Sequence, residues 1–136
     1  MGMSQENVEA FKRGIEAFNR RDIEAMLDEQ SSDVEWHPIL QVLLGGEAAV
    51  YRGHEGIRAV NEDLHSAFAG IRIEIEEIRN RADVVVGLGR VFGRSKQGLS
   101  MDEEYGLVVR FRDGRGVWGR DWYSHAEALD AAGLRE

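Results

Sequence analysis

Residues 57–75 read IRAVNEDLHSAFAGIRIEI, and within this stretch the spacing of the apolar residues changes. Up to Phe68 the apolar side chains recur every three or four residues, which is typical of one face of a helix. After Gly70 they alternate with charged residues, which is typical of a strand with one buried face. We therefore predict a helix over residues 54–69, ended by Gly70 and followed by a sheet.

Two further helices are expected before this stretch. Apolar residues three and four apart predict an amphipathic helix over residues 5–20. Asp22 can then cap a shorter helix that ends near Gln30, because its carboxylate can accept a hydrogen bond from a backbone N–H in the first turn. Short strands are expected at residues 34–37 and 50–52.

The region after Gly70 reads as an antiparallel meander. Strands are predicted over residues 71–78, 84–92, 101–111 and 117–123, with a bulge or strand end at Glu76-Glu77. The order of helices, one or two short strands, a helix and four strands indicates an α+β fold. In it the helices pack against one face of a curved antiparallel sheet.

The turn at residues 112–114 decides which side of the last strand faces the core. A two-residue Asp-Gly turn and a three-residue Arg-Asp-Gly loop place opposite sets of side chains inside. We favour the three-residue loop, because it gathers apolar residues on one face. Asp121 then lies on the inner face and Trp118 and Trp122 on the outer face. Either a homodimer contact or packing against the C-terminal segment would cover these two rings.

Composition limits the classes of function. The 136 residues fit one domain, over residues 1–136, and the absence of cysteine excludes thiol nucleophiles and disulfides. The formal charge of −8 opposes binding to nucleic acid. The longest apolar stretch, residues 39–44, is too short to span a membrane, so no membrane partner is expected. Since the N-terminus carries no export signal, we expect a cytoplasmic protein.

Four short motifs resemble one known superfamily. They are RDIEAM at residues 21–26, DVEWHP at 33–38, YRG at 51–53 and DWYSHAEALDAAGL at 121–134. Together they resemble the nuclear transport factor 2-like superfamily, and within it the SnoaL-like polyketide cyclase group. The resemblance implies a cone-shaped, cystatin-like fold whose curved sheet wraps helices and a deep pocket, and it implies a homodimer. It does not imply one reaction, because this scaffold hosts many functions.

Two members of the superfamily suggest catalytic positions. In ketosteroid isomerase the base is an Asp directly before a Pro, where this chain has His37, a residue that can act as a base near neutral pH. The isomerase's two oxyanion donors correspond to Gly14 and Leu107, so steroid isomerisation is disfavoured. In limonene epoxide hydrolase an Arg and two Asp residues cooperate. Here Arg90 and Asp121 match two of these three positions.

The third position of the hydrolase is occupied by Phe92, so an acid is missing there. Glu103 is expected on the same face as Asp121 and is the replacement proton donor that the sequence offers. The resemblance to SnoaL-type cyclases also points to Asp121, because these enzymes use an Asp on the last strand as acid and base. Both alternatives for Asp121 stay open here: a catalytic group, or a structural ion pair with Arg90.

We therefore predict three catalytic residues, with Asp121 as acid and base, His37 as a second proton carrier and Arg90 orienting Asp121 or polarising a substrate oxygen. Five further residues are predicted to bind the ligand: Trp36, Glu103, Tyr105, Tyr123 and Phe18. No metal site and no cofactor are expected, since metal-ligand types do not converge in the sequence.

The predicted partner is a small, largely apolar organic molecule. Isomerisation, aldol-type cyclisation, dehydration and epoxide opening are all compatible with cofactor-free acid/base chemistry. The alternative is a non-catalytic ligand-binding or dimerisation module of the same fold, in which the polar groups form a satisfied structural network.

Overall fold

The structure is a computed structural model that describes residues 3–39 and 50–134. Its elements follow one another along the chain as α1 (Met3–Arg20), α2 (Ile23–Asp28), β1 (Gln30–His37), β2 (Tyr51–Arg52), α4 (Gly53–Ala67), β3 (Phe68–Arg81), β4 (Val84–Ser95), β5 (Ser100–Arg112), β6 (Arg115–Trp122) and α5 (His125–Ala131). The predicted α+β class is confirmed. None of these helices has the length and apolar character that a membrane crossing needs.

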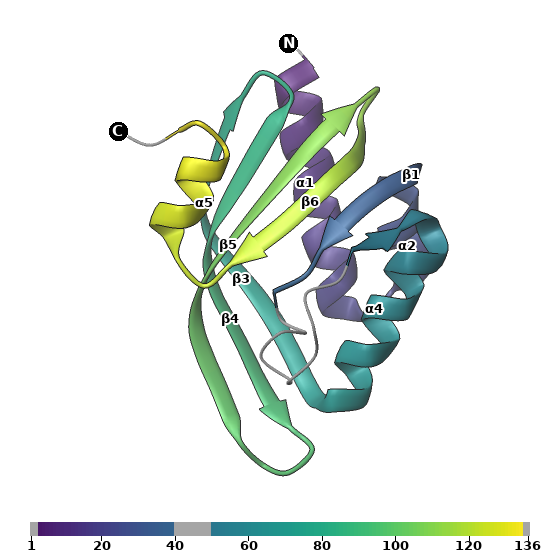
Figure 1. The fold of residues 1–136 in the computed structure, drawn as a ribbon, viewed down its shortest axis with the longest axis vertical. Helices are drawn as coiled ribbons and strands as arrows, with labels where there is room; N and C mark the ends of the chain where they lie inside the picture. The colour runs from purple at the N-terminus through teal and green to yellow at the C-terminus, as the bar shows by residue number, and fades with distance from the viewer. Residues whose placement is uncertain (1–2, 40–49, 135–136) are drawn as a thin grey trace.

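The strands form one six-stranded sheet in the order β2-β1-β6-β5-β4-β3. Strands β3 to β6 are a meander of antiparallel neighbours, as predicted, and the sheet is strongly curved (Figure 1). Strand β1 pairs with β6 in parallel and with the short β2 in antiparallel orientation. Strands β1 and β6, the first and the last in the sequence, are therefore neighbours within the sheet.

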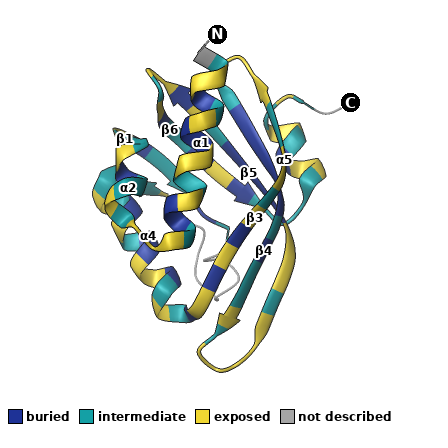
Figure 2. Ribbon diagram, turned by 180° about the vertical axis from the view of Figure 1, so that it is seen from behind, coloured by how far each residue is buried: buried dark blue, intermediate teal, exposed yellow. Residues whose placement is uncertain are grey.

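Helices α1, α2 and α4 cover one face of the sheet, here called the inner face. Phe11 and Phe18 of α1 and Leu64 of α4 are buried there against strand residues, and Figure 2 shows the buried side of α1 turned toward the sheet. Helix α5 covers part of the opposite, outer face, where Ala128 packs against Val86. Side chains that alternate along a strand therefore enter two separate apolar clusters.

An amide side chain joins α1 to the edge of the sheet. Asn19 donates from Nδ2 to the carbonyl oxygen of Ile73 at 2.8 Å and accepts from the Ile73 N–H at 2.9 Å. Strand β3 is the last strand of the sheet, so these two backbone groups have no neighbouring strand to pair with. Asn19 takes the place of that strand at one residue and fixes α1 over the inner face.

The boundary between α4 and β3 differs from the prediction. Helix α4 ends at Ala67, and Phe68, expected within the helix, is the first residue of β3. Gly70, expected to end the helix, lies inside the strand opposite Arg94. Pairing with β4 supplies the backbone hydrogen bonds that one more helical turn would have supplied, and Phe68 is buried in either case. The bulge expected near Glu76-Glu77 is found between Ile75 and Glu77.

The β5–β6 turn also differs from the prediction. Arg112 lies opposite Arg115, so the turn has two residues, and both Asp113 and Gly114 have positive φ, at 53° and 79°. A bulge follows, because Phe111 pairs with Gly116 whereas the preceding residue of β5 pairs with Trp118. The predicted three-residue loop is wrong. The bulge, however, leaves one extra residue in β6, and this shifts the alternation of the strand by one position. The predicted inner and outer faces of β6 are therefore confirmed beyond the bulge.

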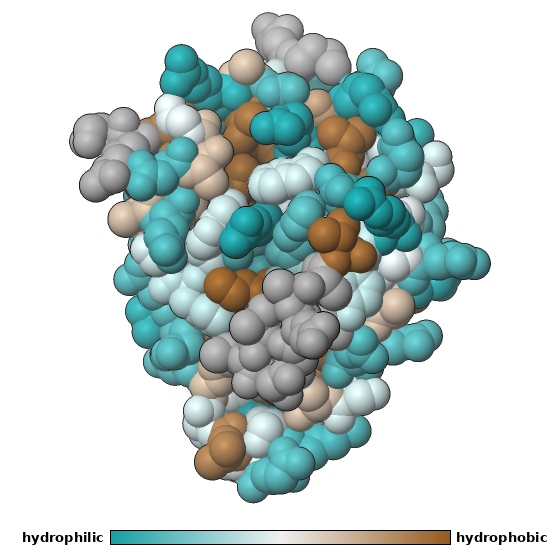
Figure 3. All heavy atoms as spheres, in the orientation of Figure 1, coloured by the Kyte–Doolittle hydropathy of each residue, from teal (hydrophilic) through white to brown (hydrophobic). Residues whose placement is uncertain are grey.

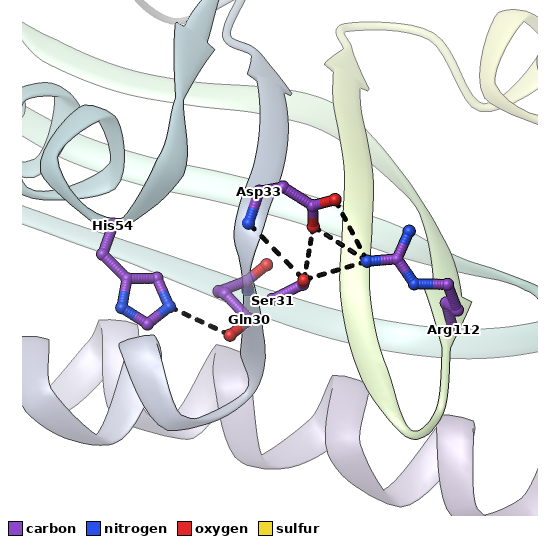
Figure 4. A network of polar contacts seen from close by, with 5 residues as sticks. All are labelled: Gln30, Ser31, Asp33, His54 and Arg112. Atoms are coloured by element: carbon purple, nitrogen blue, oxygen red, sulfur yellow. Dashed lines mark hydrogen bonds and ion pairs between the residues drawn. The ribbon is translucent and has the colours of Figure 1, made fainter.

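Polar contacts hold the irregular start of β1 in place (Figure 4). Arg112 donates to both carboxylate oxygens of Asp33 at 2.9 and 3.1 Å and to Ser31 Oγ at 3.2 Å. On the other side, His54 Nε2 lies 3.0 Å from the carbonyl oxygen of Gln30. These contacts tie β1 both to the end of β5 and to α4. They stabilise β1 where its register with β6 shifts.

Gly89 provides a test of how closely β3 and β4 approach at the β3 bulge. A Cβ at this position would lie 1.8 Å from the carbonyl oxygen of Glu74, whereas a Cβ at Gly70 would meet nothing within 4 Å. We expect Gly89→Ala to lower the free energy of unfolding by about 1–3 kcal/mol, since the backbone must shift to admit the methyl group. Gly70→Ala is the matched control and should change it by less than about 1 kcal/mol. Urea denaturation of both variants measures the difference, and equal stability of the two would contradict the close approach.

Candidate functional site

A cavity lies between the helix layer and the inner face of the sheet. It has a volume of about 110 Å³. Its walls are mostly apolar, with aromatic and aliphatic side chains from α1, α4 and β5. The polar residues on its wall are few, and in the described part of the chain they are Glu29, Gln30, Asn61, Tyr105 and Asp121. An apolar hollow with a small number of polar groups is typical of a site for a small organic molecule.

Asp121 is the buried acid of this site. It lies on the inner face of β6, opposite Leu107, and exposes 0% of its surface. One carboxylate oxygen accepts from the Tyr105 hydroxyl at 2.7 Å, and the other accepts from the Ile39 backbone N–H at 2.6 Å. The neighbouring Arg120 lies over the ring of Trp122. The charge of Asp121 is therefore stabilised by two neutral donors.

Burial changes the acidity of Asp121. Desolvation raises the pKa of its carboxyl from 3.8 to about 6, although the hydrogen bonds from Ile39 and Tyr105 act in the opposite direction. Burial and the nearby carboxylate also raise the pKa of Tyr105 well above its ordinary value. Tyr105 therefore stays a protonated donor, while Asp121 can both release and accept a proton near neutral pH.

Four of the predicted residues line the cavity: Asp121, Tyr105, Trp36 and Phe18. The ring of Trp36 lies over Gly119, where a Cβ would come within 2.5 Å of it. Because Gly119 is two residues from Asp121 on the same face, this ring packs beside the acid. Tyr123 is half-buried on the same face, and its buried hydroxyl has no hydrogen-bond partner among the described residues.

His37 lies outside the cavity. Trp36 faces the inner side of the sheet, so the next residue along β1 points to the outer side. There the His37 ring packs against Trp118, with 5.5 Å between the ring centroids, and its Nε2 lies 3.6 Å from a carboxylate oxygen of Glu35. The structure therefore does not bring His37 and Asp121 together.

Arg90 also lies on the outer face. Its Nε donates to Asp102 at 2.7 Å, on the side of the sheet opposite Asp121. The expected pairing of Arg90 with Asp121, either for catalysis or as a structural ion pair, is wrong. The reason is strand alternation, since Arg90 shares its face with the outer-face residues Val86 and Leu88. Glu103 is exposed near the far end of β5 and is not among the described cavity residues.

The sequence analysis missed three polar residues of the cavity wall. Glu29 is held by Arg13, which donates to its two carboxylate oxygens at 2.9 and 3.1 Å. Gln30 covers Gly116 at the start of β6. Asn61 is 8% exposed on α4 and could have been found from the sequence, because it occupies a position of the apolar stripe that also includes Ile57. A polar residue within such a stripe indicates either a buried hydrogen bond or a binding site.

The raised pKa of Asp121 predicts a pH-dependent stability. Because the pKa is higher in the folded state, protonated Asp121 favours folding. This contribution is complete below the unfolded pKa of 3.8 and is lost as the pH rises through about 6. We expect the unfolding free energy of the wild type, minus that of Asp121→Asn, to fall by about 2–3 kcal/mol from about pH 4 to about pH 7.

Urea denaturation at several pH values measures this difference. In Tyr105→Phe the stability contribution of protonated Asp121 should be lost at a higher pH than in the wild type. The substitution removes a hydrogen bond that stabilises the carboxylate. A difference between wild type and Asp121→Asn that stays constant over this pH range would contradict the burial of Asp121.

Comparison with solved structures places the fold. An NTF2-like protein of unknown function from Burkholderia pseudomallei is 25% identical, with a TM-score of 0.80 over 93% of this chain and 97% of that one. TerC, co-crystallised with polyporic acid, matches with the same identity, TM-score and coverage. A protein of ketosteroid isomerase-like fold from Catenulispora acidiphila, in complex with trimethylamine, is 16% identical, with a TM-score of 0.74 over 93% of each chain.

No curated protein matches the chain in sequence. The model of the SnoaL-like domain, however, matches residues 11–118, which include the second half of α1, all of α4 and most of the sheet. This region contains most of the cavity wall, and Asp121 lies three residues beyond its end. By its sequence and by its NTF2-like fold, the chain belongs to the SnoaL-like family.

Proposed function

We propose that this protein binds a small, largely apolar organic molecule in the cavity and acts on it by cofactor-independent acid/base catalysis, with Asp121 as the proton-transfer group. The observation that carries the proposal is a fully buried carboxylate on the wall of an apolar cavity, with no cation bonded to it among the described residues. Burying such a group is costly, so a carboxylate kept there by two hydrogen bonds needs a reason.

The chemistry that fits is a proton shuttle by one carboxyl group. In its ionised form Asp121 takes a proton from an acidic C–H or O–H of the bound molecule, and in its protonated form it returns the proton at a second position. Tyr105 stays protonated throughout and stabilises the ionised form by its hydrogen bond. Trp36, beside the acid, supplies a flat apolar surface against which a ring can be oriented.

The composition of the wall narrows the reaction types. In the part of the chain that the structure describes, no Lys, Arg or His lines the cavity. Epoxide opening of the limonene epoxide hydrolase type would need an Arg and a free second acid beside Asp121, whereas the other acid of the described wall, Glu29, is paired with Arg13. Isomerisation, aldol-type cyclisation and dehydration need one group that moves a proton, and these we favour.

Two similar structures support the choice of ligand class. TerC was crystallised with polyporic acid and the Catenulispora protein with trimethylamine, both small organic molecules. We expect the same class of ligand here, and polyporic acid is an available probe for the cavity.

A non-catalytic binding protein is the second candidate. It is favoured by the fact that both Asp121 oxygens already accept a hydrogen bond, one of which joins β6 to Ile39. In that case Asp121 stabilises the wall of a binding site and transfers no proton. The two candidates differ in what the loss of the carboxylate does to turnover.

Asp121→Asn separates the two candidates. Organic molecules that co-purify with the protein, identified by mass spectrometry, provide substrates. Deuterium exchange into these molecules in D₂O, or their conversion, measures proton transfer. We expect Asp121→Asn to reduce the rate by about 100-fold or more, because it removes the transferring group, and to change affinity less than about tenfold.

Asp102→Asn is the matched control, because Asp102 is a carboxylate on the outer face and pairs with Arg90. It should leave both rate and affinity unchanged. If the wild type exchanges no protons with any ligand that it binds, Asp121 is structural and the protein is a binding module.

We also expect a homodimer. The sequence left two covers open for Trp118 and Trp122, a second copy of the chain or the C-terminal segment, and the structure packs both rings in the cluster of α5. Figure 3 shows the face with α5 as mostly hydrophilic, with hydrophobic residues in small groups. The dimer contact would therefore use the half-exposed rings together with Arg110 and Arg120, which stack on them. Light scattering at micromolar concentration should give twice the mass of the chain, and the mass of one chain would contradict this prediction.

The cytoplasmic location likewise stays a prediction.

A further inference from the structure

Besides Asp121, the cavity wall contains the polar residue Asn61, on the side of the helix layer that faces the sheet. It belongs to α4 in the helix layer, whereas Asp121 belongs to β6. The side chain is more than nine-tenths buried, at 8% exposed. A ligand held between the two layers therefore meets Asp121 on one side and Asn61 on the other.

The orientation of the Asn61 amide follows from its one hydrogen bond. Nδ2 donates to the carbonyl oxygen of Ile57 at 2.9 Å. A carbonyl can only accept, so the nitrogen must face Ile57 and Oδ1 must face away from it. This oxygen has no donor among the described residues, and it is not one of the sealed, unpartnered atoms of the structure. It is therefore an accessible acceptor without a protein donor among the described residues, on a residue that lines the cavity.

Gln30 and Trp36 carry N–H donors on this wall, but no side chain of the described wall is hydrogen-bonded to this oxygen. Glu29 and Asp121 are acceptors when ionised, and the Tyr105 hydroxyl proton is already given to Asp121. Because this oxygen keeps some accessible surface, a ligand that brings a donor into the cavity can form a hydrogen bond with it. Since Ile57 is one helical turn before Asn61, its carbonyl is satisfied within α4 and does not require the side-chain amide.

We infer that Asn61 is a specificity-determining residue that accepts a hydrogen bond from a hydroxyl group of the ligand. The inference rests on the proposed function and adds a substrate class, namely a compact apolar molecule that carries at least one hydroxyl group. The neutral amide recognises the hydroxyl, whereas the ionisable Asp121 moves the proton. An ether at the same place lacks the hydrogen atom and leaves Oδ1 unpartnered.

Two matched pairs of probes test the inference. They are 2-naphthol with 2-methoxynaphthalene, and 4-phenylphenol with 4-methoxybiphenyl, so that two sizes of ligand are covered. The quantity measured by calorimetric titration is the ratio of the affinities within each pair. We expect the wild type to prefer the phenol by about 3- to 10-fold in at least one pair, which is the effect of one hydrogen bond to a neutral group.

Asn61→Leu keeps the branched shape and the number of side-chain heavy atoms, although the side chain is larger, and it removes the acceptor. It should bring the phenol-to-ether ratio close to one while the affinity for the ether stays equal or rises. The ratio is measured within one variant, so a loss of stability that weakens all probes alike does not change it. Asn61→Ala is the second variant, and it should lose the preference too. Asn80→Leu, on the exposed part of β3, is the control and should keep the wild-type ratio.

Each outcome decides a different point. A preference for phenols that survives in Asn61→Leu but is lost in Asp121→Asn overturns the inference and assigns the hydroxyl to Asp121. Equal binding of phenol and ether by the wild type overturns the inference and leaves the proposed binding function standing. Failure of all four probes to bind overturns the inference and also contradicts a cavity for small apolar molecules.

Discussion

The side of the sheet on which each residue of β6 lies depends on two compensating features of the β5–β6 hairpin. The two-residue turn at Asp113-Gly114 alone would place Asp121 on the outer face and the two tryptophans on the inner face. The bulge after Phe111 inserts one residue, Val117, and returns the strand to the other alternation. The carboxylate then lies among the apolar residues under α1 and α4. Both the cavity chemistry and the packing of α5 follow from this one-residue correction.

A carboxylate in that position is stable only with nearby donors. Tyr105 comes from the neighbouring strand, and the Ile39 N–H comes from the chain just after β1, which runs parallel to β6. The two donors offset part of the desolvation, and the remainder raises the pKa of Asp121 to about 6. A cation in place of either donor would have kept the acid ionised. Neutral donors leave it able to change its protonation state near neutral pH.

The sequence was sufficient to predict the helices and strands, but not all of the contacts that the site residues make in space. The change from helical to alternating spacing around Gly70 locates α4 and β3 within a few residues, because period depends on local geometry. The cavity positions of Trp36, Tyr105 and Asp121 also follow from alternation once β6 is placed. His37 was misplaced for a related reason, since the resemblance supplies a position along the chain but not the face of the strand.

Sequence patterns show the face on which a residue lies but not its neighbours in space. For this reason the sequence gives a wrong partner for Arg90 and does not reveal the cavity position of Asn61. Arg90 could be put on the outer face by its alternation with Val86, but its partner Asp102 depends on the register between β4 and β5, which the sequence does not show. Asn61 could be put on the buried stripe of α4, but its free oxygen becomes visible only when the walls are assembled. Asn61 and Asp121 come from segments about sixty residues apart. Pocket chemistry in this fold therefore depends on how the helix layer is placed over β6, because that placement sets both the position of Asn61 and the burial that raises the pKa of Asp121.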